Sequence, residues 1–253
     1  MQPVESLFVP PTPPSRPADP PRDETLARIM QRTRPERRVL GVLAAAVRRD
    51  DARLLDAVIA EALGWPEDNA TLQARKAVLL YDMTALLVRG GYMDLALRVA
   101  PSIPFAPGMA QVLVFSAGQP QQRYCWRVTP AYALTVGRQP AALPVRDLSQ
   151  PYQRGEVEID HGYLERVLLP RRRRPPPILL LPHPLGQVRL GNMSYVILDG
   201  NHRVVCAWRQ RRFWIPGLVL TPREGAAVLI SHSEWPPYAP VRHVSTSAQD
   251  EPR

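Results

Sequence analysis

The feature that most constrains the fold is an apolar run at residues 195–198, which leads through Asp199 and Gly200 into a segment with helical spacing. The run has no helical period and predicts a short buried strand, and Gly200 permits a tight turn because it adopts positive φ without a Cβ clash. A helix is predicted at about residues 202–212, and the first N–H groups of a helix have no partner within it. These groups, the helix dipole and the charge of Arg203 predict an anion pocket. The alternative is a turn that only caps the helix, with Arg203 solvated.

The motif at this turn is Asp-Gly-Asn-His-Arg at residues 199–203, followed by the small residues Cys206 and Ala207. It resembles the Gly-x-x-Arg signature of the ParB/sulfiredoxin-like superfamily. The order of the neighbouring segments is also similar to that superfamily: a strand at 143–145, a helix at 163–169, a Pro-Ile strand at 177–181 and a closing strand at 215–220. The resemblance covers about residues 140–222. It implies a mixed α/β domain in which the helix start binds the phosphates of a nucleotide.

The chain departs from the superfamily at two positions of the motif. Sulfiredoxins have their reactive cysteine where this chain has Asn201, so sulfinic-acid reduction is not expected. ParB partition proteins usually have Gly-Glu-Arg-Arg, where this chain has Asn201 and His202. They also continue into a helix-turn-helix, and the residues after Leu220 are too few to form one.

The resemblance implies a role for each residue of the turn. Gly200 admits a phosphate to the backbone, Asn201 and His202 supply polar contacts, and Arg203 pairs with phosphate oxygens. Asp199 binds Mg²⁺ or braces Arg203. The candidate ligands are CTP, ATP and ADP, with or without Mg²⁺. An exposed Arg203 is expected to contribute little to folding, because solvent screens its charge.

A catalytic role for the turn needs a general acid or base. A free amino acid kinase branch of the superfamily resembles the chain at the turn and uses an upstream carboxylate as base. Three upstream carboxylates are available, and no local pattern selects among them: Glu156, Glu158 and Asp160. The candidate catalytic set is His202, Asp199 and Glu158. His202 lies beside a cation and a helix start, which predicts a lowered pKa and a neutral ring.

The charge of the chain suggests a polyanionic partner. Its formal net charge is +9, its sequence pI is about 10.2, and Lys76 is its only lysine. Nucleic acid is one explanation, and the arginine bias of a GC-rich genome is the other. Four consecutive arginines form the most basic point: Arg171, Arg172, Arg173 and Arg174. They predict either a clamp on the nucleic-acid backbone or a solvated loop.

Composition and periodicity predict an α+β protein with an N-terminal helical bundle, and the resemblance implies that a ParB/sulfiredoxin-like domain follows the bundle. The predicted parts are a proline-rich tail (1–22), a helical domain (23–100), a linker (101–110), the mixed α/β domain (111–230) and a C-terminal tail (231–253). Helices are predicted near 40–47, 54–59, 70–89 and 92–100, and strands at 111–117 and 123–129.

The sequence has no pattern typical of a metal site, a secretion signal or a membrane span. The two cysteines, Cys125 and Cys206, have no metal-type spacing and predict buried structural thiols. The five histidines have no zinc-type spacing, so no metal residue is assigned. Neither a signal peptide nor an apolar run of roughly 20 residues is present, which predicts a cytoplasmic protein without a membrane partner.

Three classes of function fit the sequence. The first is a nucleotide-binding, DNA-associated module with a partition-like or plasmid/phage role, for which a homodimer is a candidate assembly. The second is an enzyme, either a phosphotransferase, a nucleotide hydrolase or a nuclease. The third is a non-catalytic adaptor in which the turn is only structural.

Overall fold

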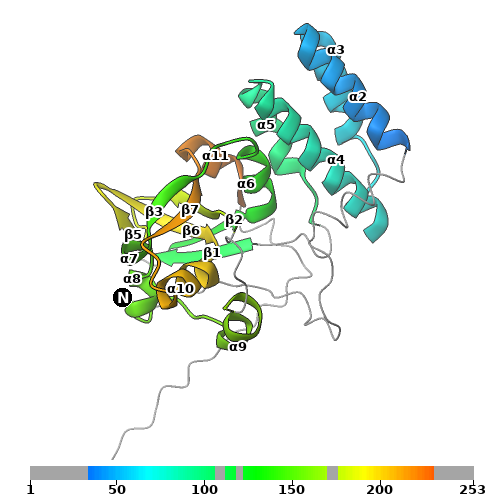
Figure 1. Ribbon diagram of the computed structural model, residues 1–253. Helices are drawn as coiled ribbons and strands as arrows, with labels where there is room; N and C mark the ends of the chain where they lie inside the picture. Colours follow the sequence, from blue (N-terminus) through cyan, green and yellow to red (C-terminus); the bar gives the residue numbers. More distant parts are fainter. Residues whose placement is uncertain (1–33, 106–111, 118–121, 170–175, 231–253) are drawn as a thin grey trace, which may run out of the picture.

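The computed structural model describes residues 34–105, 112–117, 122–169 and 176–230 (Figure 1). Helices fill the first part of this range, and strands with short helices fill the rest, which confirms a mixture of helix and sheet. The predicted tails at 1–22 and 231–253, and the arginine run at 171–174, lie outside the described residues.

The N-terminal helices follow the predicted apolar spacing. They are α2 (Arg34–Arg49), α3 (Ala52–Leu63), α4 (Ala70–Arg89) and α5 (Met93–Val99). Asp51 begins α3 by accepting from the backbone N–H of Leu54 at 3.0 Å, and Asn69 begins α4 by accepting from that of Leu72 at 3.0 Å. Each side chain satisfies one of the N–H groups that a helix start leaves without a partner.

The helical bundle and the sheet share one hydrophobic core. Leu43 and Leu79 of the bundle belong to the same buried cluster as Leu181 and Val196 of the sheet. A short 3-10 turn, η1 (Ala100–Ser102), follows α5, and the next residue, Ile103, is fully buried in that cluster. The described part of the predicted linker is therefore packed against both halves.

The main sheet has five strands in the order β3-β7-β4-β6-β5. The strands are β3 (Ala141–Pro144), β4 (Ile178–Pro182), β5 (Val188–Leu190), β6 (Met193–Asp199) and β7 (Trp214–Val219). The β4–β7 pair is parallel and the other pairs are antiparallel; α10 (Asn201–Arg209) joins β6 to β7, which lie on either side of β4. The predicted strand, turn and helix around Gly200 are confirmed.

Both faces of the main sheet are covered. Leu179 and Val196 face the core shared with the bundle, whereas Leu180 and Ile197 face a second cluster that includes Val204 of α10. This alternation follows from the two-residue period of a strand. A strand buried on both faces has a continuous apolar sequence. The apolar runs at residues 178–181 and 195–198 show this pattern, which is why β4 and β6 could be predicted.

A second, three-stranded sheet has the order β1-β2-β8, with β1 (Val112–Ala117), β2 (Gln122–Arg127) and β8 (Leu229–Ile230). The predicted strand at 123–129 was too long, since β2 ends at Arg127 and α6 (Val128–Leu134) begins at once. Pro130 explains the difference, because proline lacks the N–H that a strand pairs but is tolerated in the first turn of a helix. Short helices not predicted from the sequence complete this part: α7 (Val145–Leu148), α8 (Gln150–Gln153) and α11 (Pro222–Ala227).

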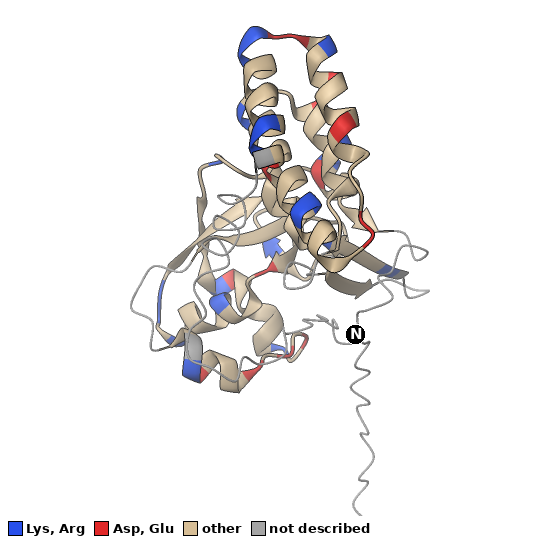
Figure 2. Ribbon diagram, turned by 90° about the vertical axis from the view of Figure 1, so that its right-hand side faces the viewer, with Lys and Arg blue, Asp and Glu red and all other residues tan. Residues whose placement is uncertain are grey.

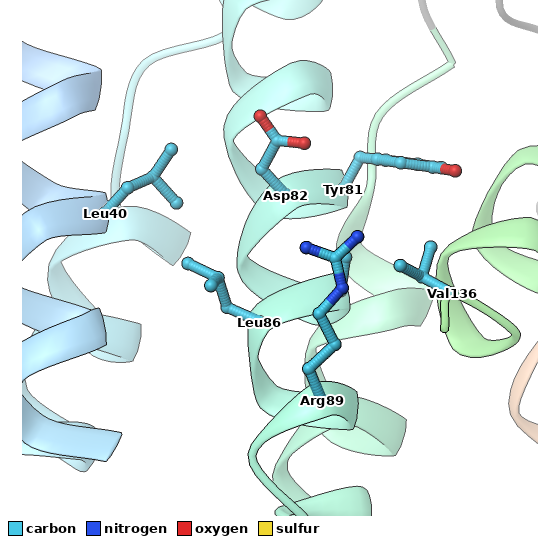
Figure 3. Close-up of a pocket in the computed structure, with 7 residues that line it drawn as sticks. Leu40, Tyr81, Asp82, Leu86, Arg89 and Val136 are labelled. Atoms are coloured by element: carbon cyan, nitrogen blue, oxygen red, sulfur yellow. The ribbon is translucent and has the colours of Figure 1, made fainter. Parts of the chain in front are cut away.

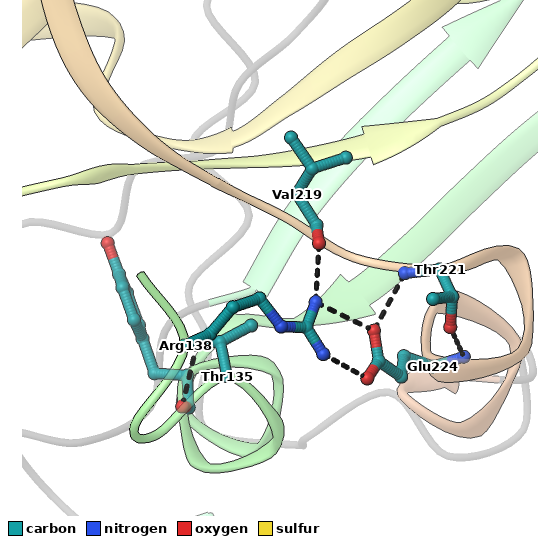
Figure 4. Close-up of polar contacts among 6 residues, drawn as sticks. Thr135, Arg138, Val219, Thr221 and Glu224 are labelled. Carbon is teal, nitrogen blue, oxygen red and sulfur yellow. Dashed lines mark hydrogen bonds and ion pairs between the residues drawn. The ribbon is translucent and has the colours of Figure 1, made fainter. Parts of the chain in front are cut away.

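A polar cluster fixes the position of α6 (Figure 4). Arg138, which follows α6, donates to the carbonyl oxygen of Val219 and to the carboxylate of Glu224, both at 2.5 Å. Glu224 is buried and forms a capping box with Thr221 at the start of α11. The cluster joins α6, the end of β7 and α11, and it holds α6 against the main sheet.

Candidate functional site

The turn between β6 and α10 requires glycine at residue 200. Gly200 has φ of 113°, in the left-handed region that favours glycine. A Cβ there would lie 2.5 Å from Cγ2 of Ile178 and 3.2 Å from Nη2 of Arg203. Both the backbone conformation and the available space therefore exclude a side chain, and the turn is as tight as predicted.

The side chain of Arg203 packs against the protein beneath the β6–α10 turn and does not extend into solvent. Its Nη1 donates to the carbonyl oxygens of Pro176 at 3.0 Å and Pro177 at 2.6 Å. Its Nη2 donates to Oδ2 of Asp199 at 2.8 Å and to Oη of Tyr132 at 3.1 Å. The side chain is 12% exposed, so the expectation of an exposed Arg203 is wrong. The physical reason is that four acceptors surround the guanidinium group on this side of the turn.

Asp199 braces Arg203, which was one of its two predicted roles. Its Oδ2 accepts from the guanidinium group of Arg203 and also from the hydroxyl of Tyr132 at 2.8 Å. Burial, followed by the charge of Asp199, raises the pKa of Tyr132, which keeps the phenol protonated as a donor. Both of these hydrogen bonds use Oδ2, and the second predicted role of Asp199, as a ligand for Mg²⁺, stays a prediction.

His202 joins the turn to the segment before α9 (His161–Tyr163). Its Nε2 accepts from the backbone N–H of Asp160 at 3.0 Å, and Tyr163 packs edge-on against its ring at a centroid distance of 5.3 Å. An Nε2 that accepts a hydrogen bond carries no proton, so the neutral ring has its proton on Nδ1. Burial lowers the pKa of His202, as do the weaker effects of His161 and Arg203, although Asp160 and Asp199 raise it. The predicted direction is confirmed, with burial as the main cause.

The first turn of α10 offers backbone N–H groups to an anion. No described side chain caps this helix start, and Gly200 stands at the N-cap position. The first hydrogen bond within α10 runs from the N–H of Val204 to the carbonyl oxygen of Gly200, so the N–H groups of Asn201 and Arg203 precede the hydrogen-bonded part of the helix. Asn201 is partly exposed, so solvent reaches this turn.

The structure distinguishes among the three upstream carboxylates. Glu158 is exposed, and among the described residues no hydrogen bond or ion pair connects it to the turn. Glu156 pairs with Arg154 at 2.6 Å. Asp160 contacts His202 through its backbone, while its carboxylate accepts from the N–H of Tyr163 at 2.9 Å and caps α9. The predicted catalytic set of His202, Asp199 and Glu158 is therefore only partly brought together.

Two residues of the site were not predicted from the sequence. Tyr132 lies on α6, 71 positions before Arg203, and nothing in its local sequence indicates a polar partner. Tyr163 was placed in a predicted helix without a role. Each reaches the turn through tertiary packing, which a local pattern does not encode.

The thiol of Cys206 does not contribute to the site. Cys206 and Cys125 are both free and buried, as predicted. Burial raises the pKa of each thiol, which disfavours the reactive thiolate. The part of the chain that the structure describes contains no cluster of three or more histidine, cysteine, aspartate or glutamate side chains placed to hold a metal ion.

A separate cleft lies away from the turn (Figure 3). It has a volume of about 400 Å³ and opens between α2, α4 and Val136, the last of which follows α6. Asp82 and Arg89, both on α4, line it together with apolar side chains. Burial raises the pKa of Asp82, and Arg89 opposes that effect. None of its lining residues belongs to the turn, so the cleft is no part of the candidate site.

Positive charge is not concentrated on the helical bundle. Basic and acidic residues are interspersed along its helices (Figure 2). Ion pairs such as Arg98 with Asp56 at 2.8 Å and Arg75 with Glu36 at 2.5 Å neutralise part of the basic charge. None of the described helices combines the length and apolarity needed to cross a bilayer.

Comparison of the chain with protein-family models, with curated proteins and with solved structures finds no match.

Replacement of Arg203 by alanine is expected to destabilise the protein. The change removes the buried guanidinium group, which leaves the half-buried Asp199 carboxylate without its cation and the carbonyl oxygens of Pro176 and Pro177 without this donor. Unfolding should become easier by about 3 kcal/mol, a fall of roughly 6 to 12 °C in melting temperature. Arg203→Lys should restore only part of the loss, because an ammonium group lacks the planar fork. In a matched control, Arg53→Ala on the exposed surface of α3 should change the melting temperature little. An unchanged melting temperature for Arg203→Ala would contradict the bracing role.

His202 is expected to make stability depend on pH. Its folded pKa is lowered, so as pH falls below about 6.5 the unfolded chain takes up the proton first and stability decreases. Above about pH 6.5 the stability that neutral His202 contributes is fully present. When the pH is lowered from 7.5 to 5.0, the melting temperature of the wild type should fall further than that of His202→Gln, whose side chain does not titrate. Equal losses would mean that the ring is not buried in solution.

Proposed function

We propose that the chain binds the phosphate of a nucleotide at the first turn of α10. The observation that carries this proposal is the helix start without a side-chain cap, which directly follows Gly200 in its left-handed conformation and is partly exposed at Asn201. Such groups, together with the helix dipole, favour an anion. The Asp-Gly-Asn-His-Arg resemblance supports phosphate as that anion, with CTP, ATP and ADP as the candidate nucleotides.

In this proposal Arg203 holds the turn in position and does not contact the ligand directly. Asp199 neutralises its charge at 2.8 Å, so the attraction for phosphate rests mainly on the helix dipole and the N–H groups of Asn201 and Arg203. Asn201 is the residue whose side chain is best placed to add a polar contact, since it is the first of α10 and partly exposed.

Binding is favoured over catalysis by the hydrogen bonds already made at the turn. Nε2 of His202 accepts from the backbone of Asp160, so it is not available as a base without breaking that contact. Oδ2 of Asp199 accepts from Arg203 and Tyr132. We therefore infer a nucleotide-binding module; the basic charge of the chain and the superfamily resemblance support a DNA-associated role.

A thermal-shift panel of CTP, ATP, ADP and GTP, each with and without Mg²⁺, tests the proposal. A nucleotide present at 100 times its Kd should stabilise the protein by about 2.7 kcal/mol, which raises the melting temperature by roughly 5 to 11 °C. The matched variant is Asn201→Asp. A carboxylate in the first turn favours the helix dipole but repels phosphate, so this variant should keep its melting temperature and lose the shift. No shift with any nucleotide, or an equal shift in Asn201→Asp, would contradict the proposal.

A further inference from the structure

A second feature of α10 lies at its opposite end, where three large aromatic side chains are exposed. Trp208 is 39% exposed, Phe213 is 84% exposed and Trp214 is 60% exposed. All three fall within the seven residues 208–214, which we call the aromatic–arginine loop. Burial of aromatic surface stabilises a fold, so several exposed rings in one short segment indicate a surface that meets a partner.

The same loop is strongly basic. Its sequence is Trp-Arg-Gln-Arg-Arg-Phe-Trp, with three arginines and no acidic residue. Arg209 and Arg211 are exposed and Arg212 is partly exposed. The arginines lie between aromatic residues at the two ends of one segment, which fits a ligand that carries both planar rings and negative charge.

Arg211 occupies a backbone position where glycine is the usual residue. It ends α10 with φ of 54°, in the left-handed region. Its N–H donates to the carbonyl oxygen of Trp208, and the N–H of Arg212 donates to that of Ala207, both at 2.9 Å. This is the Schellman arrangement, in which glycine carries no steric penalty. Arginine at this position costs backbone strain that glycine would avoid, and its side chain is exposed.

The loop is held in place by the elements around it. Tyr152 packs edge-on against Trp208 at 5.7 Å, and the carbonyl oxygen of Phe213 accepts from the N–H of Val145 at 3.0 Å. Arg209 lies 2.9 Å from Nδ1 of His161 and 3.7 Å from the carboxylate of Glu165. A surface that is already ordered loses little conformational freedom when it binds a partner.

We propose that the aromatic–arginine loop binds single-stranded nucleic acid without sequence preference. Bases stack on the exposed rings of Phe213 and Trp214, and Arg211 and Arg212 contact the phosphates. A single strand accounts for both kinds of side chain, because bases stack on aromatic rings and phosphates pair with guanidinium groups. The proposal does not depend on the nucleotide site, which lies at the other end of a nine-residue helix, about 13 Å away.

Fluorescence anisotropy with labelled dT20 and U20 and the full chain tests the proposal. Phe213→Ala and Trp214→Ala should each weaken binding by roughly 5- to 150-fold, which is the contribution of one stacked base. Because both side chains are exposed, the melting temperature should change little. Leu185→Ala, which also removes an exposed apolar side chain, is the control and should bind like the wild type.

Arg211→Gly separates binding from folding. Glycine relieves the left-handed backbone, so the melting temperature should stay equal or rise. Loss of one phosphate contact should lower the salt dependence of log K by about 0.7 for a single strand. The charge-matched control, Arg53→Ala, should leave that slope unchanged.

Three results would overturn the proposal: no binding of either oligonucleotide, equal affinity in the aromatic variants, or loss of phosphatidylserine-vesicle binding in those variants while oligonucleotide binding persists. Asn201→Asp distinguishes this site from the nucleotide site. It should abolish any nucleotide-induced thermal shift and leave dT20 affinity unchanged.

Discussion

The structure around the candidate site depends on the four hydrogen bonds donated by the guanidinium group of Arg203. They join the end of β6 through Asp199, α6 through Tyr132, and the segment entering β4 through the carbonyl oxygens of Pro176 and Pro177. A buried guanidinium group is stable only where its charge and its donors are matched, and this set of acceptors provides both. Gly200 completes the arrangement, because any side chain there would collide with Ile178 and approach the guanidinium group. The start of α10 is consequently fixed relative to β6, α6 and the segment entering β4.

Much of this region could be predicted because its determinants are local. The apolar run of β6, the glycine and the apolar spacing of α10 are encoded within about fifteen residues. The direction taken by Arg203 could not be predicted in this way. Tyr132 precedes it by 71 positions and Pro177 by 26, so the choice between solvent and these acceptors is made by tertiary packing. The same applies to Asp160, which only the contact with His202 distinguishes from Glu158.

α10 connects two surfaces with different chemistry. Its first turn presents backbone N–H groups beside a neutralised ion pair, and its last turn leads into exposed aromatic and arginine side chains. The buried middle of the helix, including Val204 and Ala207, packs on the sheet and fixes both ends relative to it. A small phosphate-bearing ligand suits the first end, and a longer polyanion with planar groups suits the second. The two proposals therefore use one rigid element and fail independently.

The central claim is that Tyr132, Asp199 and Arg203 act as one network that holds the turn. A double-mutant cycle on unfolding free energy with Tyr132→Phe and Asp199→Asn measures this coupling most directly. Residues in one hydrogen-bond network typically show interaction energies of about 0.5 to 3 kcal/mol, and we predict a value of about 1 kcal/mol or more. Effects that add to within about 0.3 to 0.5 kcal/mol would contradict the account, because they would mean that the two side chains stabilise the fold independently.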